Sequence, residues 1–489
     1  MLFNSHIFML LFLPLLLAGW YFLNWKKKFQ LAQGYLIGMS LWFYAYANLQ
    51  YLWLLLFSCL IGWLLSCLPE KIFSEKGKKV LTGVGCVFHL GLLGYFKYSN
   101  FFLENLNTVF HTDFPMLQIL LPVGISFYTF QQLAYLIDRC RGDAPRDSFF
   151  DYLTFMVYFP QLLQGPILLR SEFMGQLKEP ERRRFHAERF SEGIQFFVFG
   201  LAKKVLLADT LAKAVNYGYS NVSMLDSISA LLLAVGYLTE LYFDFGGYCD
   251  MAVGLGKMIG LEVAENFDAP FHSASVKEFW RRWHMTLGRF FTRYVYIPLG
   301  GNRRGKMRTL CNVMIVMLLS GLWHGAAWTF VLWGFLHGVG MIWDNLEHPH
   351  LPKKWMRQAA TFAYVCMTFV FFRAESIAQG IDVLKSIVSM KWNGFVFQMA
   401  SALDMTECYI ITKALSMKLP GLLSWFWLGI FVVLIAICFR VLSGEKVSGV
   451  VALQRQKGYG RLYPVLLAVL FTWSIISMTG VSEYLYFSF

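Results

Sequence analysis

Two histidines in tryptophan-rich surroundings are the residues of this sequence best suited to perform chemistry. His284 ends the segment F-W-R-R-W-H, and His324 lies in the segment S-G-L-W-H-G. An imidazole titrates near neutrality, so such a side chain can take a proton from an attacking hydroxyl as a general base. A buried histidine can also do no more than hydrogen bond within a helical bundle, and the residues alone leave both interpretations open for His324.

The segment around His284 predicts a basic amphipathic helix at a membrane surface. Four apolar residues would share one helical face with His284, while four basic residues would cover the other face. The apolar face would hold Trp280, Trp283, Leu287 and Phe291, and the basic face Lys277, Arg281, Arg282 and Arg289. We therefore expect His284 at the edge of the buried side of this helix. The alternative is an interfacial histidine that reaches toward water and has no catalytic role.

His324 follows a short apolar run, residues 310–322, that cannot cross a bilayer alone. Residues 310–343 are expected to form a hairpin of two partial spans with His324 near its turn. Gly321 and Gly325 would allow backbone or substrate to approach closely, and Trp323 and Trp328 would supply flat walls. Both histidines would then lie at membrane depth, where ionisable groups are functional candidates.

Asp244 and Asp250 lie in the stretch D-F-G-G-Y-C-D, which we expect to interrupt an apolar segment. Paired carboxylates can serve acid–base chemistry or an ion path, but they more often hold backbone or arginine partners, and we favour this second interpretation. The stretch G-L-G-K-M-I-G that follows indicates close helix packing through Gly256 and Gly260. It does not indicate dinucleotide binding, because no β-strand precedes it.

The composition is that of a helical membrane protein with several spans. Of 489 residues, 57% are hydrophobic and only 15% are charged, whereas soluble proteins carry about 25% charged residues. Residues 1–489 are therefore expected to form one integral-membrane domain. The net charge of +13 is concentrated in short segments between apolar runs, as the positive-inside rule predicts, so nucleic acid is not an expected partner. The nine cysteines stand singly and indicate neither a metal site nor a disulfide framework.

Apolar runs divided by basic segments predict about ten or eleven crossings, some of them incomplete, in an all-α fold within the lipid bilayer. Residues 31–68 would form two spans, and residues 99–113 an outer loop. Residues 152–169 have basic residues on both flanks, so this segment should enter and leave the membrane on one side as a re-entrant segment. Residues 182–184, R-R-R, would form a solvated cytoplasmic patch. Both chain termini are expected on the extracytoplasmic side.

Several longer motifs together resemble the membrane-bound O-acyltransferase superfamily. Their order and spacing are similar to those of its bacterial alginate and peptidoglycan O-acetyltransferase branch. The motifs are V-G-I-S-F-Y-T-F-Q at 123–131, Q-G-P-I at 164–167, D-F-G-G-Y-C-D-M-A-V-G-L-G, E-N-F-D-A-P, F-W-R-R-W-H, Y-I-P-L-G-G-N-R-R-G, G-L-W-H-G-A-A-W and V-F-F-R-A at 370–374.

This resemblance implies a disc of helices, thin at its centre, in which a tunnel joins the two sides of the membrane. The family's invariant histidine falls on His324, and its second motif histidine falls on His284. Acetyl-CoA would enter from the cytoplasm as the donor substrate, without a bound cofactor or metal, and a polysaccharide hydroxyl would approach from the other side. Candidate substrate-binding positions are Arg281, Arg282, Trp283, Asn302, Trp323, Asp244 and Asp250. A separate extracytoplasmic partner, similar to an acetyltransferase or esterase, often completes the transfer in this branch.

Two other functions remain open on the sequence. D-alanyl transfer from a carrier protein to teichoic acid would use the same tunnel chemistry with a different donor. A polysaccharide transporter without covalent chemistry would need a wide polar path and repeated halves, and neither is visible in the sequence. The acyl-transfer hypothesis predicts that His324 deprotonates the acceptor hydroxyl, while His284 lines the donor side and polarises the thioester or protonates a group near it.

Overall fold

The computed structural model describes the chain except for residues 68–74, 347–351, 443–445, 459, 479–483 and 486–489. Within this described part, every regular element is a helix. Six helical stretches there are long and apolar enough to cross a membrane, namely Phe8–Trp25, Leu49–Cys67, Glu75–Phe110, Ser227–Ile259, Lys306–His324 and Pro420–Leu442. The expectation of an all-helical membrane protein is confirmed, while the number of ten or eleven crossings stays a prediction.

The helices follow one another along the chain with mostly short connections, and η marks a π-helix or 3-10 helix. The first part contains η1 (Phe8–Phe12), α1 (Leu13–Trp25), α2 (Phe29–Asn48), η2 (Leu49–Tyr51), α3 (Leu52–Cys67), α5 (Glu75–Leu93), η3 (Gly94–Tyr98), α6 (Ser99–Phe110), α7 (Ile125–Arg141), α8 (Phe149–Val157), α9 (Phe159–Leu162), α10 (Arg170–Lys178), η4 (Pro180–Arg183), α11 (Ala187–Ala202), η5 (Lys203–Ala208), α12 (Asp209–Ser220), η6 (Val222–Met224) and α13 (Ser227–Ile259). The second part contains η7 (Pro270–His272), α14 (Val276–Arg282), α15 (Met285–Phe291), η8 (Thr292–Tyr296), α16 (Lys306–His324), α17 (Trp328–Trp343), α18 (Lys354–Arg373), α19 (Ile377–Val388), α20 (Phe395–Ser401), η9 (Thr406–Cys408), α21 (Tyr409–Lys418), α22 (Pro420–Leu442), α23 (Val447–Lys457) and α24 (Leu462–Ser477).

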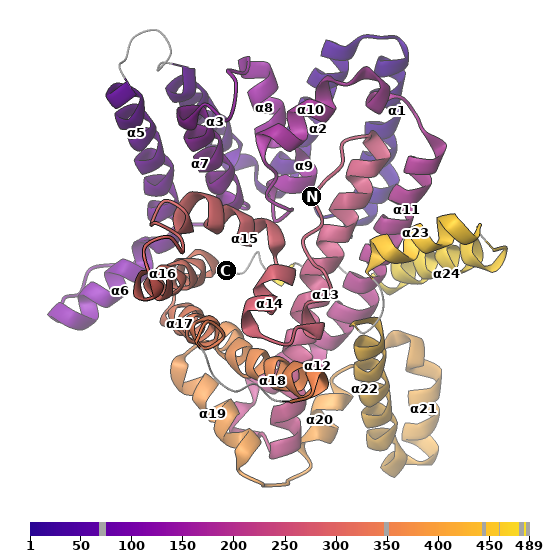
Figure 1. The fold of residues 1–489 in the computed structure, drawn as a ribbon. Helices are drawn as coiled ribbons and strands as arrows, with labels where there is room; N and C mark the ends of the chain where they lie inside the picture. The colour runs from indigo at the N-terminus through magenta and orange to yellow at the C-terminus, as the bar shows by residue number, and fades with distance from the viewer. Residues whose placement is uncertain (68–74, 347–351, 443–445, 459, 479–483, 486–489) are drawn as a thin grey trace.

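α13 is the central helix, and in Figure 1 it runs from the N-terminal helices at the top toward helices α18–α22 at the bottom, with α23 and α24 at the right. Its most apolar window is 78% buried, whereas the same measure for the peripheral helix Glu75–Phe110 is 17%. α11 packs closely on α13 through two glycine pairs. A Cβ added to Gly193 would lie 2.7 Å from the carbonyl oxygen of Gly254, and one added to Gly200 would lie 2.6 Å from that of Gly247. Only positions without side chains allow two helix backbones to approach this closely.

The expected interruption around Asp244 and Asp250 is wrong, because α13 is continuous through both residues. The helix ends instead at Gly260, whose φ of 83° favours glycine. The chain then turns back, and Leu261 donates its N–H to the carbonyl oxygen of Gly256 at 2.9 Å. The space beside Gly256 is filled by this returning chain and not by a second helix. The expected helix packing is therefore wrong for Gly256, whereas Gly260 does allow a close approach, because a Cβ there would clash with the carbonyl oxygen of Arg182 in η4.

Two helices, α2 and α3, occupy residues 31–68 as expected, and α3 lies in a candidate span, whereas the crossing by α2 stays a prediction. The expected outer loop at residues 99–113 is mostly helix. α5, η3 and α6 form one continuous stretch, Glu75–Phe110. The extended chain after α6 packs back on it. The side chain of Asn100 accepts from the N–H of Leu117 at 2.8 Å, and that of Asn107 accepts from the N–H of Phe114 at 2.9 Å. These polar side chains hold the following chain segment and do not mark a loop.

Residues 152–169 have the geometry of a re-entrant segment. The chain runs through the end of α8 and the short α9, then continues as buried irregular backbone. Asp147 precedes the segment and Arg170 follows it, and the two form an ion pair with an Nε–Oδ2 distance of 2.8 Å. The segment therefore begins and ends at one place, as the basic flanks predicted.

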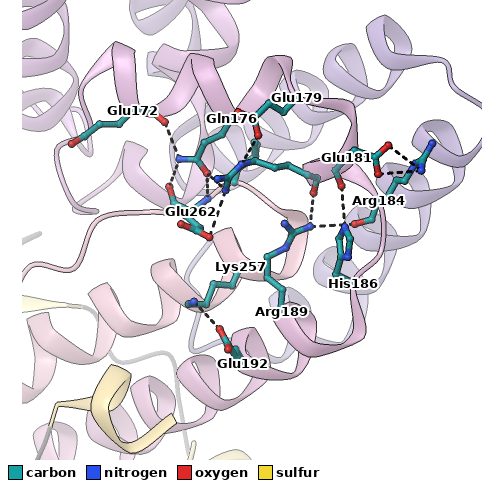
Figure 2. Close-up of polar contacts among 12 residues, drawn as sticks. Glu172, Gln176, Glu179, Glu181, Arg184, His186, Arg189, Glu192, Lys257 and Glu262 are labelled. Carbon is teal, nitrogen blue, oxygen red and sulfur yellow. Dashed lines mark hydrogen bonds and ion pairs between the residues drawn. The ribbon is translucent and has the colours of Figure 1, made fainter. Parts of the chain in front are cut away.

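The three arginines at 182–184 do not form one solvated patch. Arg183 is only 5% exposed, and its guanidinium donates to the carbonyl oxygen of Leu177 at 2.6 Å. Arg184 does lie at the surface, where it pairs with Glu181 at 3.0 Å (Figure 2). The buried arginine is tolerated because backbone carbonyls satisfy its donors and the ring of Trp20 lies 5.8 Å from its guanidinium carbon.

Candidate active site

His324 is the last residue of α16, at the turn of the expected hairpin with α17. The hairpin is confirmed, and its two helices cross at glycines. The expectation that its first helix is too short to cross a bilayer is wrong, because α16 is 19 residues long and apolar enough to do so. A Cβ added to Gly321 would lie 2.4 Å from the carbonyl oxygen of Phe330, and one added to Gly334 would lie 2.5 Å from that of Met317. This contact places the start of α17 directly beside the end of α16.

Aromatic rings enclose the imidazole of His324, which is 3% exposed. The ring centroids of Trp333 and Phe372 each lie 5.1 Å from the imidazole centroid, and that of Trp323 lies at 4.9 Å. The expectation that Trp328 forms a wall is wrong. Its side chain is 56% exposed and donates to Asn105 of α6 at 2.8 Å. Trp333 takes that place because it lies five residues further along α17, about 140° around the helix from Trp328 and next to Gly334, which packs against Met317 of α16.

His284 does not lie on one continuous amphipathic helix, and this expectation is wrong. It separates α14 from α15 with a φ of 46° and is 1% exposed. The chain before α14 causes the break, because Asp268 donates its N–H to the carbonyl oxygen of Arg282 at 2.9 Å. Met285 likewise donates its N–H to the carbonyl oxygen of Asn266 at 3.0 Å. His284 is therefore a fully buried residue and not an interfacial one.

The side chain of Asn266 orients His284. Its Oδ1 accepts from the N–H of Thr286 at 3.1 Å and lies 3.2 Å from Nδ1 of His284. A carbonyl oxygen can only accept, so this contact assigns the proton of a neutral His284 ring to Nδ1 and the basic lone pair to Nε2. His284 lies outside the six candidate spans, and burial lowers the pKa of its imidazole to about 3, which keeps the ring neutral.

Trp323 contacts both histidines. Its ring centroid is 4.9 Å from that of His324 and 6.0 Å from that of His284. The indole is 4% exposed, stacks on Phe130 at 5.3 Å and donates to the carbonyl oxygen of Ser126 at 3.4 Å. α7 therefore fixes the tryptophan that contacts both imidazoles.

A third buried histidine, His337 of α17, was not predicted from the sequence patterns. Trp280 donates its indole N–H to Nδ1 of His337 at 3.2 Å, so Nδ1 must accept and Nε2 must carry the proton. Nε2 lies 2.9 Å from the hydroxyl oxygen of Thr368, whose own hydrogen goes to the carbonyl oxygen of Val365. Both ring nitrogens are thus engaged in holding α14, α17 and α18 together, which leaves His337 a structural role.

A cavity of about 430 Å³ lies beside the two short helices and α16. Its lining includes Lys277, Arg281 and Arg289 on α14 and α15, and Ser320 on α16. Ser320 is four residues before His324 and so lies on the same helical face, one turn away. The cavity has the size of a small-molecule site, about 300–1,000 Å³.

The arginines expected around the donor site differ in their partners. Arg289 forms a two-bond ion pair with Glu172, one bond of which measures 3.0 Å, and Arg282 pairs with Glu278 at 2.9 Å. Arg281 is exposed, lines the cavity and makes no hydrogen bond or ion pair with the described residues. Arg281 is therefore the arginine of this group that is available to an anionic ligand.

Three other predicted substrate-binding residues lie apart from the histidines. Asp250 pairs with Lys203 at 2.7 Å, and Asp244 pairs with Lys204 at 2.5 Å. Asp244 also accepts from the backbone N–H of Leu485 at 3.0 Å, so the expected backbone partner is confirmed for this residue, while lysines of η5 take the place of the expected arginines. Asn302 is exposed in the loop before α16. In the part of the chain that the structure describes, no group of three or more His, Cys, Asp or Glu side chains could hold a metal ion.

Trp283 is buried in an aromatic cluster, where it stacks on Phe279 with centroids 5.3 Å apart. The same ring also meets Phe369 of α18 at 5.6 Å. These contacts favour a packing role over contact with substrate. Asn266 belongs to the motif E-N-F-D-A-P, and this motif was the one signal in the sequence for its role.

Comparison with known proteins is consistent with this arrangement. A model of the membrane-bound O-acyltransferase family (MBOAT) matches residues 141–380, which include both histidines. A peptidoglycan O-acetyltransferase of Helicobacter pylori is 35% identical over 423 residues, which cover 80% of this chain and 80% of the relative. A probable alginate O-acetylase of Azotobacter vinelandii is 39% identical over 389 residues, which cover 77% of this chain and 76% of the relative. A teichoic acid D-alanyltransferase of Streptococcus thermophilus is 28% identical over 253 residues, which cover 49% of this chain and 58% of the relative.

Proposed function

Because this chain belongs to the membrane-bound O-acyltransferase family and is an O-acyltransferase, we propose that it transfers an acetyl group from acetyl-CoA to a hydroxyl of an exported or cell-wall polysaccharide. Relatives at 35% and 39% identity are named for O-acetyl transfer to peptidoglycan and alginate. The D-alanyltransferase relative is only 28% identical over half of the chain. This difference favours acetyl over D-alanyl as the transferred group.

In this reaction His324 acts as the general base. The hydroxyl oxygen of the acceptor attacks the carbonyl carbon of the thioester, and the imidazole takes the hydroxyl proton. The C–S bond then breaks, and the imidazolium returns the proton to the leaving CoA thiolate. The observation that carries the proposal is the position of His324, walled by aromatic rings and one turn beyond a residue of the 430 Å³ cavity. A positioned base contributes about 10²–10⁴ to such a rate.

The donor occupies the cavity beside α14, α15 and α16. Its phosphates bind at the rim near Lys277 and Arg281, and the pantetheine arm extends past Ser320 toward His324. A charge-assisted bond to Arg281 needs no rearrangement, because this guanidinium pairs with no carboxylate among the described residues. In this arrangement the cavity is the cytoplasmic part of a tunnel whose other end receives the acceptor.

His284 and His324 both contact Trp323, and Asn266 contacts Nδ1 of His284. Because Nδ1–H donates to Asn266, Nε2 is the acceptor nitrogen of this ring. We therefore assign to His284 the role of accepting a hydrogen bond from the substrate, for example from an amide N–H of the pantetheine arm. Protonation of the thioester would require the opposite tautomer, which the contact with Asn266 disfavours.

In the proposed reaction His324 lies at membrane depth, and the acceptor hydroxyl reaches it from the extracytoplasmic side. Both chain termini lie on that side in this topology, and a separate extracytoplasmic protein assists the transfer to the polysaccharide. Mass spectrometry of the cell-envelope polysaccharide, with and without this protein, identifies the acyl group and its recipient.

The test uses the purified full-length protein with an oligosaccharide acceptor, acetyl-CoA and, in parallel, a D-alanyl carrier-protein thioester. Acetyl-CoA alone should support turnover, measured as CoA release and as acetylated product. His324→Ala should abolish turnover while the protein stays folded, and His284→Ala should lower it strongly. His186→Ala is the matched control, because this imidazole is exposed and bonds only the carbonyl oxygen of Glu181 among the described residues (Figure 2). Near-normal turnover of His324→Ala would refute the mechanism, and turnover with the carrier thioester alone would reassign the donor.

A further inference from the structure

Two side chains of a neighbouring helix hold the C-terminal end of α16, where His324 lies. The last carbonyl groups of an α-helix have no partner within the helix and must be satisfied from outside. Tyr98 donates its hydroxyl to the carbonyl oxygen of Leu322 at 2.5 Å. The ammonium of Lys97 donates to the carbonyl oxygen of Trp323 at 2.7 Å and to that of His324 at 3.0 Å.

These contacts complete the end of the helix. The remaining terminal carbonyl, that of Gly321, accepts from the N–H of Gly325 at 3.4 Å. The third contact of the Lys97 ammonium is the hydroxyl oxygen of Ser126 at 3.4 Å, at the start of α7. A cation thus lies at the negative end of the α16 dipole and ties the turn that carries His324 to α7.

Lys97 and Tyr98 reach α16 from η3, a π-helical turn inside the long stretch Glu75–Phe110. Adjacent residues of a regular α-helix point about 100° apart, so two neighbours seldom reach one target. A π-helical turn changes this spacing, and such turns occur frequently at functional sites. The irregular turn in an otherwise regular helix is therefore explained by the contact that it makes with the end of α16.

We propose that Lys97 is a positioning residue for acyl transfer: its ammonium fixes the last turn of α16, and thereby the imidazole of His324, relative to α7. This inference rests on the proposed role of His324 as the base. Burial of a lysine at membrane depth costs free energy that an apolar residue at the same position would not cost. The presence of Lys97 here therefore indicates a specific role. Its contacts are backbone carbonyls and a hydroxyl, and it acts through His324 without touching the reacting atoms.

The positioning role predicts a separation of kinetic parameters. The donor binds at the cavity rim near Arg281, away from Lys97, so removal of the ammonium leaves KM for acetyl-CoA nearly unchanged. The orientation of the base enters kcat, and a misplacement of about 1 Å lowers a rate about 100-fold. We therefore expect Lys97→Met to lower kcat about 100-fold with KM for acetyl-CoA within about twofold of the parent value.

Two further variants test whether kcat depends on the number of hydrogen bonds that remain at the end of α16. Lys97→Arg keeps a cation with several donors and should regain part of the lost kcat, because the carbonyl oxygens of Trp323 and His324 stay bonded. Tyr98→Phe removes one bond to the same helix end and should lower kcat by a smaller factor. Lys257→Met is the matched control, since this lysine pairs with Glu192 at 2.9 Å at the far end of α13 (Figure 2).

The measurement is steady-state acetyl transfer by the purified full-length protein at varied acetyl-CoA, with folding checked by size exclusion and thermal unfolding. A parent-like kcat in Lys97→Met, or a loss confined to KM, would overturn the inference, as would an equal kcat loss in Lys257→Met. If Lys97→Met does not fold, Lys97→Arg and Tyr98→Phe decide, and parent-like kcat in both overturns it. His324→Ala is measured alongside. Turnover retained there would refute the proposed base, whereas its loss together with a parent-like Lys97→Met would refute the positioning role alone.

Discussion

A methyl group added at Gly321 would test whether the close crossing of α16 and α17 holds the candidate site together. A Cβ at this position would lie 2.4 Å from the carbonyl oxygen of Phe330, a backbone atom that cannot rotate away. Ordinary contact begins at 3.4 Å. Gly321→Ala must therefore push the two helices apart by about 1 Å, because a close-packed interior has no free space to absorb the methyl group.

Two consequences follow from that separation. Overpacking of this kind lowers the free energy of unfolding by about 1–3 kcal/mol. It also moves Trp333 of α17 away from His324 of α16, whose ring centroids are 5.1 Å apart. Misplacement of a reacting group by about 1 Å lowers a rate about 100-fold. Gly321→Ala should therefore show both a lower unfolding temperature and a kcat reduced about 100-fold.

The assay compares CoA release and thermal unfolding across three alanine variants. Gly338→Ala is an intermediate case, because its Cβ would meet the flexible side chain of Met314, with Sδ at 2.7 Å. Gly91→Ala on α5 is the control, since nothing lies within 4 Å of the added Cβ. We expect the defect to fall in the order Gly321, Gly338, Gly91. Equal rates and unfolding temperatures for Gly321→Ala and Gly91→Ala would refute the argument that this crossing positions His324.

Two further predictions concern charged residues. Arg281→Gln should raise KM for acetyl-CoA and change the unfolding temperature little. Arg289→Gln should lower the unfolding temperature, because Glu172 loses its partner. If kinetics and thermal unfolding show the reverse pattern, the donor does not bind at the rim near Arg281. Lys203→Met should lower the free energy of unfolding by about 3 kcal/mol because it leaves Asp250 unpaired in a largely buried site, and adding Asp250→Leu should restore most of the loss, as chemical denaturation would measure. If the double variant is no more stable than Lys203→Met, the loss of stability does not come from the unpaired charge of Asp250.

Much of the architecture could be predicted from local patterns. The two helices within residues 31–68, the hairpin at residues 310–343 and the return of segment 152–169 to the place where it begins were all correctly expected. Each depends on features that a short stretch carries by itself, such as the length of an apolar run, a polar break or basic flanks. The position of His324 at a helix end follows from the same kind of information.

The surroundings of the site could not be predicted in this way. The amphipathic pattern around His284 was read as one helix, but Asn266, 18 residues earlier in the chain, bonds the residues at the break. The wall beside His324 is Trp333 and not Trp328, because the glycine crossing decides which face of α17 meets α16. Lys97 is more than two hundred residues from the helix end that it holds.

The sequence alone therefore determined the class of this protein, its lipid-embedded helical build and the two histidines worth testing, because burial of apolar surface depends on residue type and period. Only the tertiary structure decided which lysine meets which aspartate, which arginine stays available and which tautomer His284 adopts. Hydrogen bonds and ion pairs act over about 3 Å, so they depend on which distant elements packing brings together.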